Sequence, residues 1–145
     1  DVLLGHEWRQ IFDDRRLLLQ PLAYDLSLHS MVPMEELRNV ALPTSNRIFY
    51  VNNNPIAAPP RHPMMQRALD RAIDTLLGNG ADLEIQSTTG PGNLTAALAA
   101  HARVLAIAGE PADFKILLDW YITSEPFWDL EYRNDARNWR NIGPR

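Results

Sequence analysis

The sequence contains no cysteine in its 145 residues. This excludes a disulfide framework, a thiol nucleophile and a thiolate metal site. Long apolar runs are also missing, because the most apolar stretch, Leu94 to Ala108, is interrupted by His101 and Arg103. A membrane helix needs roughly 18 apolar residues, and no N-terminal stretch has the pattern of a secretory signal. We therefore expect a soluble chain without a transmembrane segment, and both a cytoplasmic location and that of a secreted effector stay open.

Positive charge is sparse and scattered. The chain has 14 Lys and Arg residues against 18 Asp and Glu, for a formal net charge of −4, and Arg15-Arg16 is its densest basic pair. Nucleic-acid-binding surfaces usually gather basic residues on one face, so we predict no nucleic-acid partner. The motifs HExxH, GxSxG, GxxxxGK[ST] and GxGxxG are missing. The histidines at positions 6, 29, 62 and 101 lack metal-ligand spacing.

The pattern of apolar residues predicts a series of short elements. Its clearest element is a helix from Pro63 to Leu77, in which apolar residues recur at three- and four-residue spacing and Gly78 supplies the stop. The other expected elements are a helix over Glu7 to Leu19 that ends before Pro21, a short helix over Met34 to Arg38, a strand over Arg47 to Val51 that enters a loop at Asn52, a short strand over Leu83 to Gln86, a polar loop over Ser87 to Asn93, a helix over Leu94 to Ala108 and a helix from Pro111 to about Trp120.

This order of elements is typical of the second half of an α/β domain, helix-rich with few short strands. The predicted strands are too few for a whole sheet. We therefore interpret residues 1–145 as a single, partial domain whose first half is missing from these residues.

Three polar segments are candidates for chemistry. In Thr88 to Asn93, two glycines permit a close approach of the backbone to a ligand, and the threonine hydroxyls and the following helix N-terminus offer donors to a phosphate or a sugar. A plain Gly-Pro-Gly turn with Asn93 or Thr95 as a cap is the competing interpretation. In Asn52 to Ala58, clustered asparagines could hydrogen-bond a ligand, although an Asx-rich turn explains them equally.

The third segment is the tail, where carboxylates and arginines alternate beside Trp139. Such a tail could hold a diphosphate and a divalent cation, or it could be a solvated, salt-bridged end of the chain with Trp139 as an anchor. His62 precedes Pro63 and could equally be a helix-start residue.

Taken in order, these segments resemble a known family. The matching pieces are Asn54-Pro55-Ile56-Ala57-Ala58, Arg61-His62-Pro63-Met64-Met65, the amphipathic helix, Thr89-Gly90-Pro91-Gly92-Asn93-Leu94-Thr95, and Trp139 near the C-terminus. The series is similar to that of the glycosyltransferases with an Asp-X-Asp sugar-binding region, which include fungal and bacterial mannosyl- and galactosyltransferases and, more distantly, the clostridial glucosylating toxins. The resemblance is best over Asn52 to His101.

The resemblance implies the C-terminal portion of a Rossmann-like domain of the glycosyltransferase A type, with the nucleotide-binding half upstream in the same protein. It implies a UDP- or GDP-sugar donor, a glycan or protein acceptor, and Mn²⁺ or Mg²⁺. By the same resemblance, Thr89 and Gly90 lie at the reacting centre. The donor is bound by Asn52, Asn54, His62, Thr88, Pro91 and Trp139. Inversion and retention both stay open.

The chain departs from the family in containing no Asp-X-Asp. Its opening, Asp1-Val2-Leu3-Leu4, is similar to the second Asp of that motif and the apolar residues after it, so we expect Asp1 to be a metal ligand and Asp135 a second one. Two rival interpretations remain. One is a non-catalytic helical interaction or scaffold domain, or a degenerate transferase fragment. The other is a different α/β enzyme that binds phosphate with the Thr-Gly-Pro-Gly loop.

Overall fold

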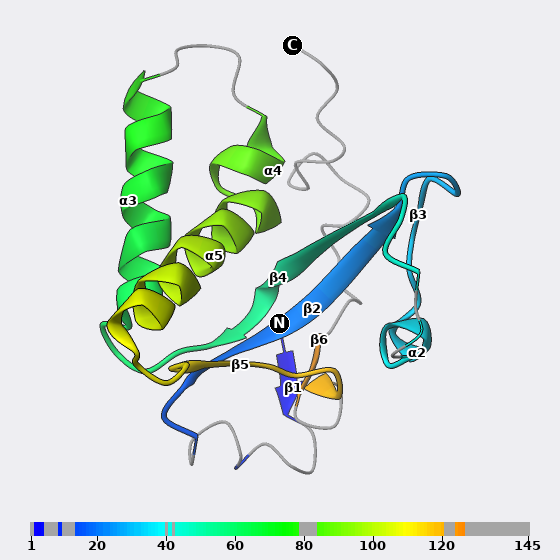
Figure 1. Ribbon diagram of the computed structural model, residues 1–145, viewed down its shortest axis with the longest axis horizontal. Coiled ribbons are helices and arrows are strands. Elements are labelled where there is room, and N and C mark those ends of the chain that lie inside the picture. The colour runs from blue at the N-terminus through cyan, green and yellow to red at the C-terminus, as the bar shows by residue number, and fades with distance from the viewer. Residues whose placement is uncertain are drawn as a thin grey trace.

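The computed structural model describes residues 2–4, 9, 14–39, 41, 43–78, 84–120 and 124–126. Figure 1 labels their elements, which are β1 (Val2–Leu4), β2 (Leu17–Asp25), β3 (Ser30–Met31), α2 (Met34–Leu37), β4 (Arg47–Ala57), α3 (Pro63–Gly78), α4 (Ile85–Thr88), α5 (Pro91–Ala108), β5 (Phe114–Ile116) and β6 (Ser124–Pro126).

The sheet is built around β2. Strands β3 and β4 pair with it in antiparallel fashion on opposite sides, and β5 pairs with its first residues in parallel. Strands β1 and β6 form a separate antiparallel pair. The predicted α/β class is confirmed in this broad sense. A Rossmann-like sheet would be mainly parallel, whereas the described sheet is mainly antiparallel, so the finer assignment stays a prediction.

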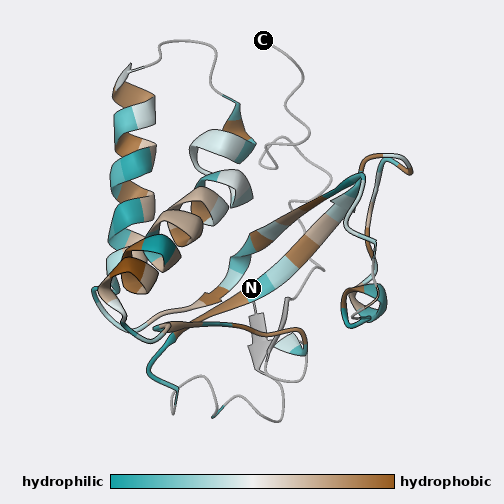
Figure 2. Ribbon diagram, in the orientation of Figure 1, coloured by the Kyte–Doolittle hydropathy of each residue, from teal (hydrophilic) through white to brown (hydrophobic). Residues whose placement is uncertain are grey.

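The core lies between this sheet and two helices. Leu17, Leu19 and Val51 contribute the sheet side of the core, and α3 and α5 contribute the helical side through Met64, Ala68, Leu94, Ala97 and Leu98. In Figure 1, α5 lies between α3 and β4. Figure 2 shows hydrophilic and hydrophobic bands alternating along α3, the pattern that led us to expect this helix. Burying this apolar face is the main stabilising contribution to such a packing.

Three of the predicted helices are confirmed. The helix predicted from Pro63 is α3, the short helix from Met34 is α2, and the alanine-rich helix is α5, which starts slightly earlier, at Pro91. Gly109 ends α5 in the left-handed conformation, with φ of 68°. Glycine adopts this conformation without a steric penalty, which is why the helix stops there.

The helix predicted over Glu7 to Leu19 is wrong in its last turn. Leu17, Leu18 and Leu19 belong to β2 and are at most 2% exposed, because both faces of the sheet are covered here. A continuous apolar run suits a strand covered on both faces as well as a helix, so periodicity did not separate the two. Pro21 does not end a helix but lies in β2, beside a shift of the pairing register.

Two further predictions fail between Leu83 and Trp120. Residues Ile85–Thr88 form helix α4 instead of a strand, because the side chain of Glu84 accepts hydrogen bonds from the backbone of Gln86 and Ser87 and caps the helix. The polar loop predicted over Ser87 to Asn93 is correspondingly short. The helix predicted from Pro111 is wrong, since Phe114–Ile116 form β5 on β2. None of the described helices has both the length and the apolar content needed to cross a bilayer.

Asp25 fixes the turn between β2 and β3. Its carboxylate accepts hydrogen bonds from the Ser27 hydroxyl, from the backbone N–H groups of Ser27 and Leu28, and from Arg47 Nε at 3.1 Å. These donors, the Ser27 hydroxyl foremost, hold the pKa of Asp25 well below its usual range. The stability that they contribute is therefore fully present above the ordinary carboxyl pKa of about 4 and is lost as the pH falls below it.

We expect Asp25→Asn to be less sensitive to acid than the parent. The free energy of unfolding, measured in urea at pH 6 and at pH 3, should fall less between these pH values in the variant, because its amide does not titrate. Ser27→Ala, which removes one donor and keeps the carboxylate, should give an intermediate loss. An equal loss in Asp25→Asn and the parent would contradict this role for Asp25.

Candidate functional site

The asparagine-rich segment is a bulge in β4, not the loop that the sequence predicted. Leu19 pairs with Ile56, and Pro21 pairs with Val51, so the residues between Val51 and Ile56 protrude from the ladder opposite Gln20. The Asn52 Nδ2 donates to Gln20 Oε1 at 2.8 Å, and Asn52 Oδ1 accepts from the Asn54 N–H at 3.3 Å. Bulges commonly redirect side chains beside functional sites.

This bulge leaves part of its polar surface in solvent. Asn53 and Asn54 are exposed, and Asn52 is half-buried, whereas Pro55 packs inward after a cis peptide bond. The side-chain amide of Asn54 is therefore accessible from solvent. It can both donate and accept hydrogen bonds, which is the capacity that sugar hydroxyls require.

The Thr-Gly-Pro-Gly segment joins α4 to α5. Thr88 is buried and its hydroxyl donates to the Glu84 carbonyl at 2.8 Å, whereas Thr89 is exposed. Gly90 is the N-cap of α5, and Pro91 is its first residue. A Cβ added to Gly90 would lie 2.9 Å from Gln86 Cα, and one added to Gly92 would lie 2.8 Å from the Gln86 carbonyl oxygen. The close approach that these glycines permit is thus to the backbone of α4.

The bulge and the Thr-Gly-Pro segment, distant in the sequence, meet in space. The backbone N–H of Val51, the residue before the asparagines, donates to Thr95 Oγ1 at 3.0 Å, and this hydroxyl also donates to the Pro91 carbonyl at 2.7 Å. One hydroxyl therefore attaches the first turn of α5 to the outer edge of β4. This contact brings two of the three segments that the sequence singled out to the same end of α5.

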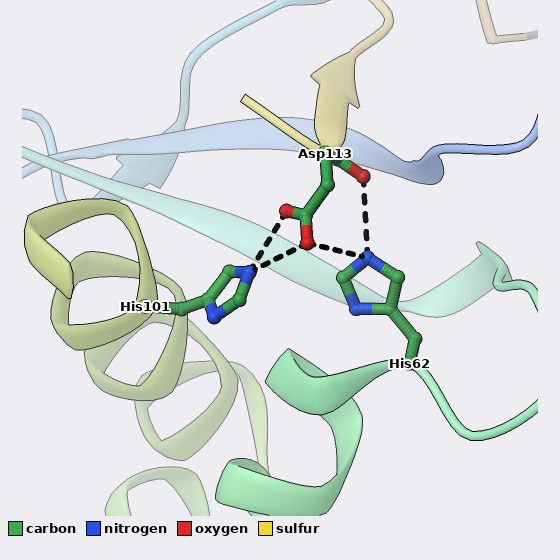
Figure 3. A group of neighbouring side chains, drawn as sticks. All are labelled: His62, His101 and Asp113. Carbon is green, nitrogen blue, oxygen red and sulfur yellow. Dashed lines mark hydrogen bonds and ion pairs between the residues drawn. The ribbon is translucent and has the colours of Figure 1, made fainter. Parts of the chain in front are cut away.

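His62 lies elsewhere, in a cluster with His101 and Asp113. Figure 3 shows both imidazole rings turned toward the Asp113 carboxylate. His101 Nε2 lies 2.8 and 3.0 Å from the two carboxylate oxygens, and His62 Nε2 lies 3.2 Å from the Asp113 carbonyl oxygen and 3.4 Å from its Oδ2. The rings meet edge to face at 5.6 Å, and both histidines are at most 6% exposed.

The hydrogen bonds of His62 fix its tautomer. Its Nδ1 accepts from the Met64 N–H at 3.3 Å and so caps the N-terminus of α3, which places the ring proton on Nε2. Both ring nitrogens are thereby engaged within the protein. In this arrangement His62 offers no free nitrogen to a donor sugar, although the resemblance placed it in the donor site.

The same hydrogen bonds decide whether this cluster fits a metal ion. Its ligand atoms lie within 4.8 Å of one another, and it is the one group of this kind in the described residues. If His62 Nε2 bound a metal ion, the ring proton would have to move to Nδ1. There it would face the Met64 N–H, and two donors would meet without an acceptor. Mn²⁺ and Mg²⁺ also prefer oxygen ligands. The cluster therefore does not fit either ion, and we interpret it as a structural junction between α5, β5 and the start of α3.

Sequence reasoning missed the roles of His101 and Asp113. The sequence assigned His101 no role beyond its place in the predicted helix, but it is 4% exposed. A signal was present, because His101 occurs in the buried stripe of α5 with Leu94, Leu98 and Leu105. A buried imidazole needs a hydrogen-bond partner, although the sequence alone does not identify Asp113 as that partner.

Three predicted site residues lie outside the described residues: the expected metal ligands Asp1 and Asp135, and the donor-binding Trp139. Near the bulge, a groove of about 630 Å³ is lined by Asp14, Arg15, Arg16 and the run Ile56 to Pro60. Arg16 donates to both oxygens of Asp14, at 2.9 and 2.7 Å, and lowers the pKa of that carboxyl to about 2.

Comparison with protein-family models, with curated proteins and with solved structures gave no match for this chain.

Proposed function

We propose that this chain is the donor-binding part of a glycosyltransferase that moves a sugar from a nucleotide-sugar donor to a hydroxyl acceptor. The single observation that carries the proposal is the hydrogen bond between Val51 and Thr95. It joins the asparagine bulge to the helix that follows Thr89 and Gly90, so two segments of the family's series share one end of α5.

The exposed groups at this end suit a sugar. The Asn54 amide and the Thr89 hydroxyl are both exposed, and neutral amides and hydroxyls pair readily with sugar hydroxyls. The groove beside Ile56 to Pro60 has a volume of about 630 Å³, within the range of small-molecule sites. Arg15 adds positive charge to its lining, whereas Arg16 is paired with Asp14. A nucleoside diphosphate is the anionic part of such a donor, and guanidinium groups bind phosphate well.

In the proposed reaction, the bond between the anomeric carbon and the diphosphate oxygen breaks, and the nucleoside diphosphate leaves with the bonding electron pair. A bond forms from the anomeric carbon to the acceptor hydroxyl oxygen, whose proton is released to the leaving diphosphate or to solvent. The described residues would bind and orient the sugar for this step, and orientation alone can supply a large part of catalysis. Mn²⁺ or Mg²⁺ stays a prediction attached to Asp1 and Asp135, since the described residues include no group that fits these ions.

Binding of the donor tests the proposal. The protein would be melted with Mn²⁺ and UDP-sugar or GDP-sugar, since a ligand that binds the folded state raises the melting temperature. We expect a rise with one of these donors, and Asn54→Ala and Thr89→Val should each weaken donor binding about tenfold. Thr44→Val, at an exposed position outside the bulge, is the matched control and should bind as the parent does. A folded protein that no nucleotide sugar stabilises would refute the proposal.

A scaffold function is the alternative that one observation favours. On α3, Leu69, Ile73 and Leu76 recur at helical spacing and are 54%, 43% and 50% exposed, and Leu77 is 82% exposed. Such a stripe is typical of a surface that binds another protein or another part of the same protein. A double variant with Leu69→Ser and Ile73→Ser separates the alternatives. If the chain is a transferase, this variant should bind the donor as the parent does.

A further inference from the structure

A second groove, of about 840 Å³, lies between α3 and α5; we call it the arginine groove. Its lining includes three arginines, Arg61, Arg67 and Arg71, and three alanines of α5, Ala96, Ala97 and Ala100. Thr95 contacts β4, whereas the next residue, Ala96, lines this groove. The arginine groove and the asparagine bulge therefore lie on different sides of α5.

The arginines in this groove have no acidic partner in the described part of the chain. The ion pairs formed there involve Arg16, Arg38 and Arg47 but none of the three groove arginines. Two acids also line the groove, Asp70 and Asp74, and the Gln66 side chain donates to Asp70 at 2.8 Å. The positive charge of the guanidinium groups is therefore available to a ligand.

Both like and opposite charges are neighbours on α3, since Arg67 lies three residues before Asp70 and Arg71 three residues before Asp74. Arg67 and Arg71 are four residues apart, as are Asp70 and Asp74. Like charges at this spacing destabilise an isolated helix. The opposite arrangement, an ion pair along the helix, is not formed by Arg67 or Arg71 in the described residues. An anion placed between the two guanidinium groups would remove their repulsion.

The floor of the groove leaves room for such an anion. Ala96 and Ala100 present only methyl groups opposite the arginines. The volume of about 840 Å³ lies within the range of small-molecule sites. Guanidinium groups one helical turn apart start from Cα atoms separated by about 6 Å along the axis, a spacing that one phosphoryl or diphosphoryl group can bridge.

We propose that the arginine groove binds a phosphoryl-bearing small molecule. The guanidinium fork matches phosphoryl oxygens in a bidentate manner. A carboxylate carries a single charge over two oxygens, so it gains less from two arginines than a more highly charged anion does. A phosphoryl group carries more charge over three oxygens and can contact two arginines at once. This site does not depend on the proposed transferase activity, because it shares no residue with the asparagine bulge.

Inorganic pyrophosphate is the probe for this site. The full-length protein would be titrated with it at low salt by calorimetry and by phosphorus NMR. We expect Arg67→Ala and Arg71→Ala each to weaken binding about tenfold, because each removes charge-assisted hydrogen bonds. Arg71→Lys should fall between the parent and Arg71→Ala, since lysine keeps the charge but loses the fork. Arg103→Ala, at an exposed position of α5 outside the groove, should bind as the parent does.

Further binding measurements identify the kind of molecule that carries the phosphoryl group. Tighter binding of a nucleoside diphosphate that competes with pyrophosphate would identify a nucleotide ligand, and equal or weaker binding would identify the free anion. Arg15→Ala, in the groove proposed for the donor diphosphate, should retain pyrophosphate binding, which separates this site from the donor site. Pyrophosphate affinity that is unchanged in both Arg67→Ala and Arg71→Ala, or no greater than the affinity for glutarate, would overturn the proposal.

Discussion

Replacing Asp113 by alanine is expected to lower the free energy of unfolding by about 3 kcal/mol. The substitution leaves two buried imidazole N–H groups without the carboxylate, and His101 loses both of its contacts, at 2.8 and 3.0 Å. A buried donor without a partner costs about 1–3 kcal/mol, and the loss affects three elements at once. Urea unfolding monitored by circular dichroism measures the difference.

Two control variants separate hydrogen bonding from charge. Asp113→Asn retains one carbonyl acceptor, so we expect about half the loss. Asp119→Ala removes an exposed carboxylate that pairs with Arg38 on the surface, and such pairs contribute about 0–1 kcal/mol. A stability of Asp113→Ala within about 0.5 kcal/mol of the parent would contradict the structural role.

Gly90→Ala and Gly92→Ala should each destabilise the protein by about 2–3 kcal/mol. At Gly90 an added Cβ would lie 2.9 Å from Gln86 Cα and 3.0 Å from the Ile85 carbonyl oxygen. At Gly92 it would lie 2.8 Å from the Gln86 carbonyl oxygen. These neighbours are backbone atoms, which cannot rotate away as a side chain can, so α4 would have to move.

Gly78→Ala is the matched control for these two variants. A Cβ on Gly78, at the end of α3, meets nothing within 4 Å, and alanine favours a helix more than glycine does. We expect that variant to be neutral or stabilised by up to about 1 kcal/mol. Thermal unfolding of all three variants compares them directly. Equal stability of Gly90→Ala and Gly78→Ala would show that α4 does not pack against α5 as described.

The sequence predicts helices in this protein better than it predicts strands. The apolar residues of α3 are periodic, and the ends of α3 and α5 carry proline and glycine, so local signals alone locate both helices. Leu17 to Leu19 carry no such signal, because their strand conformation depends on β4 and β5, which come much later in the chain. Asp113 to Ile116 likewise become extended only because β2 offers a free edge there.

The same distinction between local signals and contacts of distant residues applies to the candidate site. The asparagines and the Thr-Gly-Pro segment were identified from composition, but their meeting depends on the hydrogen bond between Val51 and Thr95, which no local pattern encodes. The resemblance placed His62 in the donor site, whereas in the structure its ring contacts other parts of the protein. Its ring caps α3 and contacts Asp113, and a contact between residues on three different elements is a property of the tertiary structure.

The parallel pairing of β2 with β5 has a consequence for the order of folding. Leu17 at the beginning of β2 pairs with Phe114, so this contact closes a loop that contains most of the chain. Contacts between residues so distant in sequence form slowly, because the entropy of closing the loop is lost before they stabilise the fold. We infer that the antiparallel β2–β4 pair and the α3–α5 pair assemble first. On the ribosome, the edge of β2 at Leu17 to Leu19 then stays unpaired until the residues after Gly109 have emerged. In this interval a nascent chain is most exposed to mispairing with another strand.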